Sequence, residues 1–101
     1  MARKIHYHSL FECDVREAAD WYDRRSAGLG VRFVDLVAES VAEAAAEPLR
    51  HASGPAGCRY VRVTRFPYVV LFDVTPDEIQ FLGVLHTARS IDKWRERLDP
   101  A

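Results

Sequence analysis

The sequence contains little cysteine and no long apolar run. Its two cysteines, Cys13 and Cys58, belong to no Cys-x-x-Cys or Cys/His ligand spacing, so we expect reduced thiols rather than a disulfide framework or a zinc site. No apolar run approaches the ~18 residues of a membrane-spanning helix, and residues 1–15 lack the apolar core of a signal peptide. These absences predict a cytoplasmic protein with no membrane contact.

An excess of positive charge is also missing. The 14 Lys and Arg residues against 15 Asp and Glu residues give a formal net charge of -1, so the whole molecule has no bulk attraction to nucleic acid. The charge is uneven, however, because residues 48–72 hold four arginines and no acidic residue. Either this segment is a solvated surface that is basic by chance, or it contacts another macromolecule.

The chain has no internal repeat, glycine-rich phosphate loop or low-complexity segment. Its 101 residues are close to the commonest size of a protein domain, and 49% hydrophobic with 29% charged residues is typical of a soluble globular chain. We therefore expect a single domain over residues 1–101 with a modest core of its own.

Residues 58–85 predict a three-stranded antiparallel meander. Three runs rich in β-branched and aromatic residues, at 58–65, 68–74 and 79–85, are separated by proline-containing turns. The second run is almost entirely apolar, which is typical of a central strand covered on both faces. In the first run, alternation places Val61 and Val63 against a covering layer of helices, and Tyr60 and Arg62 on the opposite face.

Residues 4–8 predict a short strand that must add to the meander, giving a four-stranded sheet. His6 and His8 share one face of this strand, as a metal-binding pair would. No third ligand with a clear spacing stands nearby, so we prefer an exposed polar strand face and expect no metal site. Gly83, in the last strand, indicates either a bulge or a close approach of another group.

Residues 10–26 and 31–47 carry apolar side chains at helical spacing, and their short connection predicts an antiparallel helical hairpin. Ser9 with Glu12 predicts a capping box, and Gly28 suits a left-handed residue after the first helix. The apolar stripes are Val15, Ala18, Ala19 and Tyr22 in the first helix and Phe33, Val37, Val41 and Ala44 in the second.

A third, short helix is predicted over residues 90–98, with Ser90 as its cap and Trp94 in the core. Trp21 and Tyr22 are adjacent in the first helix and cannot both face inward. One of the two is expected to be exposed or covered by a partner, which favours a protein-binding surface.

The order of these elements, together with short motifs, resembles the RelE/ParE superfamily of type II toxin–antitoxin toxins, in particular its ParE-like branch. The motifs are EAADWY at 17–22, LGVRF at 29–33, Pro48 after the second helix, RFPYVVLF at 65–72 and GVLHTARSIDKW at 83–94. The resemblance covers nearly the whole chain. It implies an α+β fold with an N-terminal strand, an antiparallel helical hairpin, a three-stranded antiparallel meander and a short C-terminal helix.

The resemblance also implies a small toxin that a cognate antitoxin holds inactive in a hetero-oligomer, with no cofactor. ParE-type members inhibit DNA gyrase without evident catalysis, whereas RelE-type members cut messenger RNA on the ribosome. A third alternative is a degenerate, non-toxic member that only binds its antitoxin.

The residues favour a binding toxin over an enzyme. In an endoribonuclease, the catalytic candidates would be Arg62, His86 and Arg89. The two arginines would bind the phosphate, and His86 would transfer the proton. The arginine that RelE-type enzymes carry early in the next strand is missing, because residues 68–70 are uncharged, and Trp94 has no hydroxyl group to transfer a proton. We therefore predict a growth-inhibiting toxin with gyrase, ahead of the ribosome, as its target. The predicted target- or antitoxin-binding residues are Arg59, Arg62, Arg65, Arg89, Trp21 and Tyr60.

Overall fold

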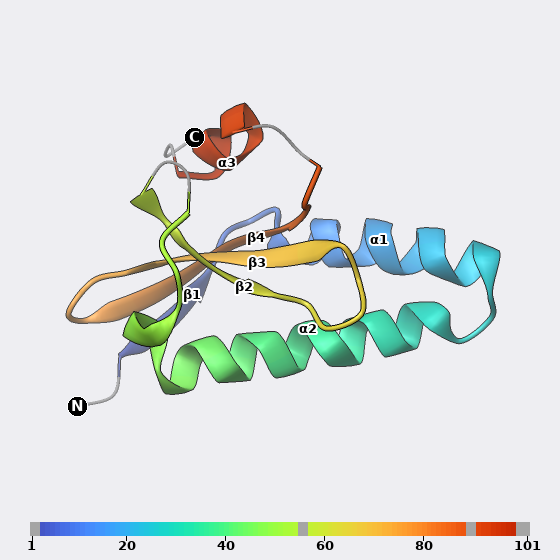
Figure 1. Ribbon diagram of the computed structural model, residues 1–101, viewed down its shortest axis with the longest axis horizontal. Coiled ribbons are helices and arrows are strands. Elements are labelled where there is room, and N and C mark those ends of the chain that lie inside the picture. The colour runs from blue at the N-terminus through green and yellow to red at the C-terminus, as the bar shows by residue number, and fades with distance from the viewer. Residues whose placement is uncertain (1–2, 55–56, 89–90, 99–101) are drawn as a thin grey trace.

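The computed structural model describes residues 3–54, 57–88 and 91–98, and shows the predicted order of elements (Figure 1). A strand and two long helices come first, followed by a short 3₁₀ turn, three strands and a short helix. Their bounds are β1 Lys4–Tyr7, α1 Phe11–Arg25, α2 Leu29–Ala46, η1 Pro48–Arg50, β2 Arg59–Arg62, β3 Tyr68–Val74, β4 Glu78–His86 and α3 Ile91–Leu98. Ser90 and Arg89 lie outside the described residues.

The four strands form one mixed sheet in the order β1-β4-β3-β2. Strands β2, β3 and β4 form the antiparallel meander that the sequence predicts, and β1 joins the far edge parallel to β4. The α+β fold class is therefore confirmed. Strand β2 ends earlier than predicted, because the chain turns at 63–67, where the Val63 N–H donates to the Tyr68 carbonyl (2.9 Å) and Arg65 has a φ of 69°.

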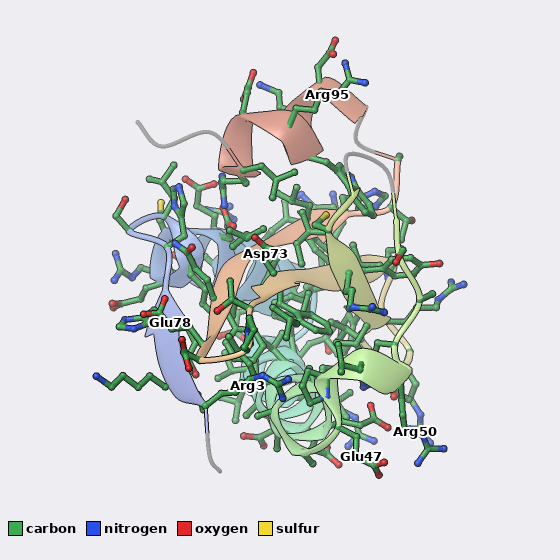
Figure 2. All side chains as sticks on the ribbon, turned by 90° about the vertical axis from the view of Figure 1, so that its left-hand side faces the viewer. Arg3, Glu47, Arg50, Asp73, Glu78 and Arg95 are labelled. Carbon is green, nitrogen blue, oxygen red and sulfur yellow. The ribbon has the colours of Figure 1, made fainter. Side chains whose placement is uncertain are left out.

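Helices cover both faces of the sheet. Figure 1 shows the antiparallel α1–α2 hairpin on one face and α3 at the opposite side of the molecule. The view in Figure 2 separates the layers further, with Arg95 on α3 at one end and Glu47 and Arg50, after α2, at the other. The core is accordingly divided into two clusters by the sheet.

Strand alternation decides which side chains enter each cluster. On the hairpin face, Val61 and Val63 join Phe33 and Phe72, as predicted. On the α3 face, the buried Trp94 packs with Val69, Leu71 and Leu85, which confirms its predicted place in the core. Strand β3 supplies both clusters and is covered on both faces, because successive side chains of a strand point in opposite directions.

The turn of the helical hairpin depends on two glycines. Gly28 has a φ of 88°, the left-handed conformation that was predicted there. Gly30 is buried against α1, and its N–H donates to the Asp23 carboxylate at 2.7 Å. A Cβ atom at residue 30 would lie only 2.8 Å from that carboxylate, so the two helices could not approach as closely with any other residue.

The predicted capping box at the start of α1 is wrong. The N-cap residue is Leu10 rather than Ser9, and no side-chain hydrogen bond caps the helix from the N-cap position. His8 takes over the role, because its Nδ1 accepts the Leu10 N–H (3.0 Å) and its carbonyl accepts the Phe11 N–H (3.0 Å). Glu12 is therefore free to form an exposed ion pair with Arg16.

Gly83 marks both features that the sequence left open, a bulge and a close contact. Leu71 pairs with Gly83 whereas Phe72 pairs with Phe81, so Leu82 is the extra residue of a β-bulge. A Cβ atom at residue 83 would meet the Asp14 carboxylate at 2.8 Å. The missing side chain leaves room for an ion pair between α1 and α3.

Asp14 and Arg97 form this ion pair, with oxygen–nitrogen distances of 2.5 and 2.7 Å. Asp14 also accepts the Val84 N–H (3.0 Å), and Arg97 donates to the Leu82 carbonyl (3.2 Å). Both side chains are largely buried, with exposed fractions of 12% and 14%. The hydrogen bond to Asp14 raises the pKa of the Arg97 guanidinium above its usual value. The pair thus joins α1, the β4 bulge and α3.

We predict that Asp14→Asn lowers the free energy of unfolding by about 3 kcal/mol, because it leaves a largely buried guanidinium without its counter-charge. Urea denaturation measures the change. Glu12→Gln is the matched control on the same helix, since it breaks only an exposed pair and should cost less than ~1 kcal/mol. Equal stability losses in the two variants would contradict the structural role of Asp14.

Candidate functional site

The side chains of Arg62 and Tyr60 project from β2 on the α3 face of the sheet. They line a hollow of about 370 Å³. We call this the arginine hollow. Its other walls come from the loop after η1, from the end of β4 and from α3. The lining residues used below are Ser53, Gly54, Tyr60, Arg62, Thr87 and Trp94. The hollow therefore combines one cation, two aromatic rings and three hydroxyl-bearing side chains.

The loop before β2 is held close to this hollow. The Gly54 N–H donates to the Cys58 carbonyl (2.6 Å), and the Tyr60 N–H donates to the Ala52 carbonyl (3.2 Å). A Cβ atom at residue 54 would lie 2.8 Å from the Trp94 ring and 2.9 Å from the Tyr60 ring, so only glycine allows this approach. The Tyr60 and Trp94 rings meet edge to face, with centroids 5.9 Å apart. The aromatic wall is therefore a packed and fixed surface.

Arg62 projects from this wall into solvent. Its side chain is exposed, and within residues 3–54, 57–88 and 91–98 no carboxylate lies within 4 Å of its guanidinium. Its backbone is fixed, because the Arg62 carbonyl accepts a hydrogen bond from the Ser40 hydroxyl of α2 (3.2 Å). A fixed backbone with an unpaired guanidinium is suited to binding an anionic group of another molecule.

The other predicted arginines do not share this hollow. Arg59 is partly buried and donates to the His51 carbonyl at 2.6 Å, which ties β2 to the preceding loop. Arg65 is exposed in the turn before β3. Arg89 lies outside the described residues. Within the described part of the chain, Arg62 is the one predicted arginine that lines the hollow.

A second and larger depression, about 840 Å³, lies between α1 and the end of β4. We call it the α1–β4 groove. Trp21 stands on its helical wall, 44% exposed, with the Arg25 guanidinium 3.8 Å from the centre of its ring. Tyr22 turns inward and packs against Phe33 and Phe66, so the prediction that one of the two adjacent rings is exposed is confirmed.

His86 lies in this groove and not in the arginine hollow. Its ring contacts Tyr68 on the hairpin face of the sheet (5.2 Å between centroids), and its Nδ1 accepts the Ala88 N–H at 3.0 Å. Arg62 points from the opposite face. The structure therefore does not bring together Arg62 and His86, which the nuclease hypothesis needs at one phosphate.

The two strand histidines have other contacts. His6 Nε2 lies 3.3 Å from Glu78 on the surface, and His8 accepts the backbone hydrogen bond that begins α1. Among the residues described, no three His, Cys, Asp or Glu side chains gather closely enough to hold a metal ion. In the same part of the chain, none of the helices has the length and apolar character of a membrane span.

Comparison with known proteins decides the family. Residues 5–91 match the family described as the ParE toxin of the type II toxin–antitoxin system parDE. The chain belongs to the ParE toxin family. A solved structure of the chromosomal ParDE system from P. aeruginosa superposes with a TM-score of 0.73 and 20% sequence identity, covering 83% of this chain and 95% of that chain. No curated protein sequence matches the chain. The predicted RelE/ParE-like fold and ParE-like branch are thus confirmed.

In this ParE family member, sequence reasoning missed two residues of the groove, Cys13 and Glu17. The Cys13 thiol donates to the Glu17 carboxylate (3.4 Å). That hydrogen bond, together with the negative charge of Glu17, raises the pKa of Cys13 above the ordinary value. The signal was present in the spacing, because residues 10, 13, 14, 17 and 21 share one face of a helix.

We predict that Glu17→Gln makes Cys13 react roughly two- to fivefold faster with iodoacetamide at about pH 8. The thiolate is the reactive form, and loss of the carboxylate lowers the raised pKa and so increases the thiolate fraction. Peptide mass spectrometry measures labelling at each cysteine. Glu12→Gln is the control and should leave the rate unchanged, while Cys58, 1% exposed, should stay unlabelled in both. Equal rates in the two variants would contradict the contact.

Proposed function

We propose that this ParE family chain is a growth-inhibiting toxin that binds a macromolecular target through the arginine hollow and is neutralised by a cognate antitoxin. The observation that carries the proposal is the exposed guanidinium of Arg62, which has no carboxylate within 4 Å among the described residues and lies beside the packed rings of Tyr60 and Trp94. Arginine, tyrosine and tryptophan are the residues that contribute most to binding energy at protein interfaces. The hollow thus has the composition of a binding site.

DNA gyrase is the proposed target. Family resemblance implies it, since ParE-type toxins inhibit gyrase. The overall charge agrees with a protein target, because a formal net charge of -1 gives no general attraction to a large RNA surface. An antitoxin partner is proposed because the chain belongs to a toxin–antitoxin family and shares its fold with the ParDE system of P. aeruginosa.

Catalysis on messenger RNA is the alternative that the geometry supports less well. Attack by a 2′-hydroxyl group needs a proton acceptor, a proton donor and cations around one phosphate. Around Arg62, the described residues supply hydroxyl groups from Ser53, Tyr60 and Thr87 but neither a histidine nor a carboxylate. His86 lies in the α1–β4 groove, on the other face of the sheet from Arg62. A binding role is therefore preferred.

Two assays in vitro test the proposal. Addition of the chain should inhibit DNA supercoiling by gyrase and leave messenger RNA intact in a translating extract. Unchanged supercoiling together with cuts at defined codons would replace gyrase by the ribosome. Normal division of cells that contain the folded, soluble chain would identify a non-toxic member of the family.

A second prediction concerns Arg62 itself. Arg62→Ala should abolish growth arrest and supercoiling inhibition, yet change the free energy of unfolding by no more than about 0.5 kcal/mol, because the side chain is exposed. Arg32→Ala is the matched control, since Arg32 is an exposed arginine on α2, away from the hollow. Full toxicity of Arg62→Ala at normal expression would disprove the role of the hollow.

A further inference from the structure

The arginine hollow has an apolar floor and a polar rim. Val69 and Trp94, which are 3% and 8% exposed, form the floor together with the half-buried ring of Tyr60. The rim consists of exposed side chains that can form hydrogen bonds, namely Ser53, Arg62 and Thr87. A molecule that binds here therefore meets polar groups at the opening and apolar surface below them.

Arg62 is the one charged residue among the lining residues that the structure describes. The nearby basic residues of α3 do not add to it, because Lys93 lies 3.6 Å from a carboxylate of its own helix and Arg97 is paired with α1. Arg95 is exposed but does not line the hollow, and Arg59 donates to a backbone carbonyl. The hollow thus presents a single positive charge.

A single positive charge does not suit a nucleic acid. Phosphates recur along each strand, and proteins that bind nucleic acid neutralise several of them with lysine and arginine side chains. Single strands also require exposed aromatic faces on which their bases stack. Trp94, however, is almost buried and meets Tyr60 edge to face, with ring centroids 5.9 Å apart. The hollow therefore lacks both features of a nucleic-acid site.

A carboxylate group matches what the hollow offers. The planar guanidinium of an arginine donates two parallel hydrogen bonds to the two oxygens of one carboxylate. The hydroxyl groups of Ser53 and Thr87, on the same rim, are able to donate further hydrogen bonds to such an anion. An apolar side chain next to the carboxylate would cover the floor and remove its remaining surface from water.

The backbone that carries Arg62 is fixed before any partner binds. The Ser40 hydroxyl of α2 donates to the Arg62 carbonyl (3.2 Å), and the next residue, Val63, donates its N–H to the Tyr68 carbonyl (2.9 Å). A fixed backbone lowers the entropy lost on binding and limits the directions from which the guanidinium can be approached. We therefore expect the planar shape of the arginine side chain to matter as well as its charge.

We propose that the arginine hollow recognises an acidic side chain of a partner protein, an aspartate or glutamate that stands beside an apolar residue. The carboxylate forms a bidentate ion pair with Arg62, and the apolar neighbour packs on Tyr60 and Val69. The statement that this partner is the target of the toxin rests on the function proposed above. The inference adds the chemical feature by which the chain selects that target.

The test is a selection of phage-displayed random peptides on the purified full-length chain, after peptides that also bind the Arg62→Ala chain have been removed. Enriched peptides should contain an aspartate or glutamate next to an apolar residue. Replacement of that acid by its amide should weaken binding of the synthetic peptide by about tenfold or more, because the charge is lost. Arg62→Lys should weaken it by about tenfold, because lysine keeps the charge without the paired donors.

Arg32→Ala is the matched control and should leave the peptide affinity unchanged, because Arg32 is exposed on α2 away from the hollow. A labelled single-stranded RNA and a DNA duplex serve as nucleic-acid probes, and neither should show binding that depends on Arg62. Tighter binding of either probe than of the peptides, lost in Arg62→Ala, would make the hollow a phosphate site and overturn the proposal. So would a failure to enrich acidic peptides, or equal affinity of the parent and Arg62→Lys chains.

Growth and supercoiling assays separate this inference from the proposed function. If Arg62→Lys is as toxic as the parent chain while Arg62→Ala is not, bidentate recognition of a carboxylate is wrong and the toxin proposal stands. If neither the parent chain nor any variant inhibits growth or gyrase, the toxin proposal fails. The peptide selection then still decides which chemical group the hollow binds.

Discussion

The ion pair between Asp14 and Arg97 is the contact on which the arrangement of the molecule depends. It joins α1 and α3 across the β4 bulge, and its remaining hydrogen bonds go to the backbone that the bulge exposes. By fixing α3, it keeps Trp94 over the second core cluster and against Tyr60, which forms the wall of the arginine hollow. By filling the edge at Val84, it also limits the α1–β4 groove. One largely buried ion pair thus shapes both surfaces.

The arginine hollow and the α1–β4 groove differ in chemistry. The arginine hollow lies on the α3 face of the sheet and offers a cation beside aromatic rings, which suits an anionic or mixed surface. The α1–β4 groove lies on the hairpin side, and its apolar wall also carries Glu17 and the Asp14–Arg97 ion pair. The two surfaces approach each other along residues 86–88, where His86 and Ala88 line the groove and Thr87 lines the hollow.

Much of the fold could be predicted from local patterns. The order of elements, the helical hairpin, the inward positions of Val61 and Val63, the left-handed Gly28 and the burial of Trp94 all follow from spacing and alternation. The capping box is absent because Leu10 rather than Ser9 precedes the helix, and His8 accepts the Leu10 and Phe11 N–H groups. The predicted site residues lie in two places. Arg62 and Tyr60 line the arginine hollow, whereas Trp21 and His86 line the α1–β4 groove.

The sequence by itself determined which residues are helical, which strands pair locally and which faces are apolar, because each of these properties depends on neighbours a few residues away. The tertiary structure alone decided that β1 lies beside β4, that Asp14 meets Arg97, and that Arg62 and His86 point from opposite faces of the sheet. Such relations join residues far apart in the chain. These long-range contacts depend on the order of the strands and on the extra residue Leu82 in β4. The hydrophobic pattern of the sequence predicts neither of them unambiguously.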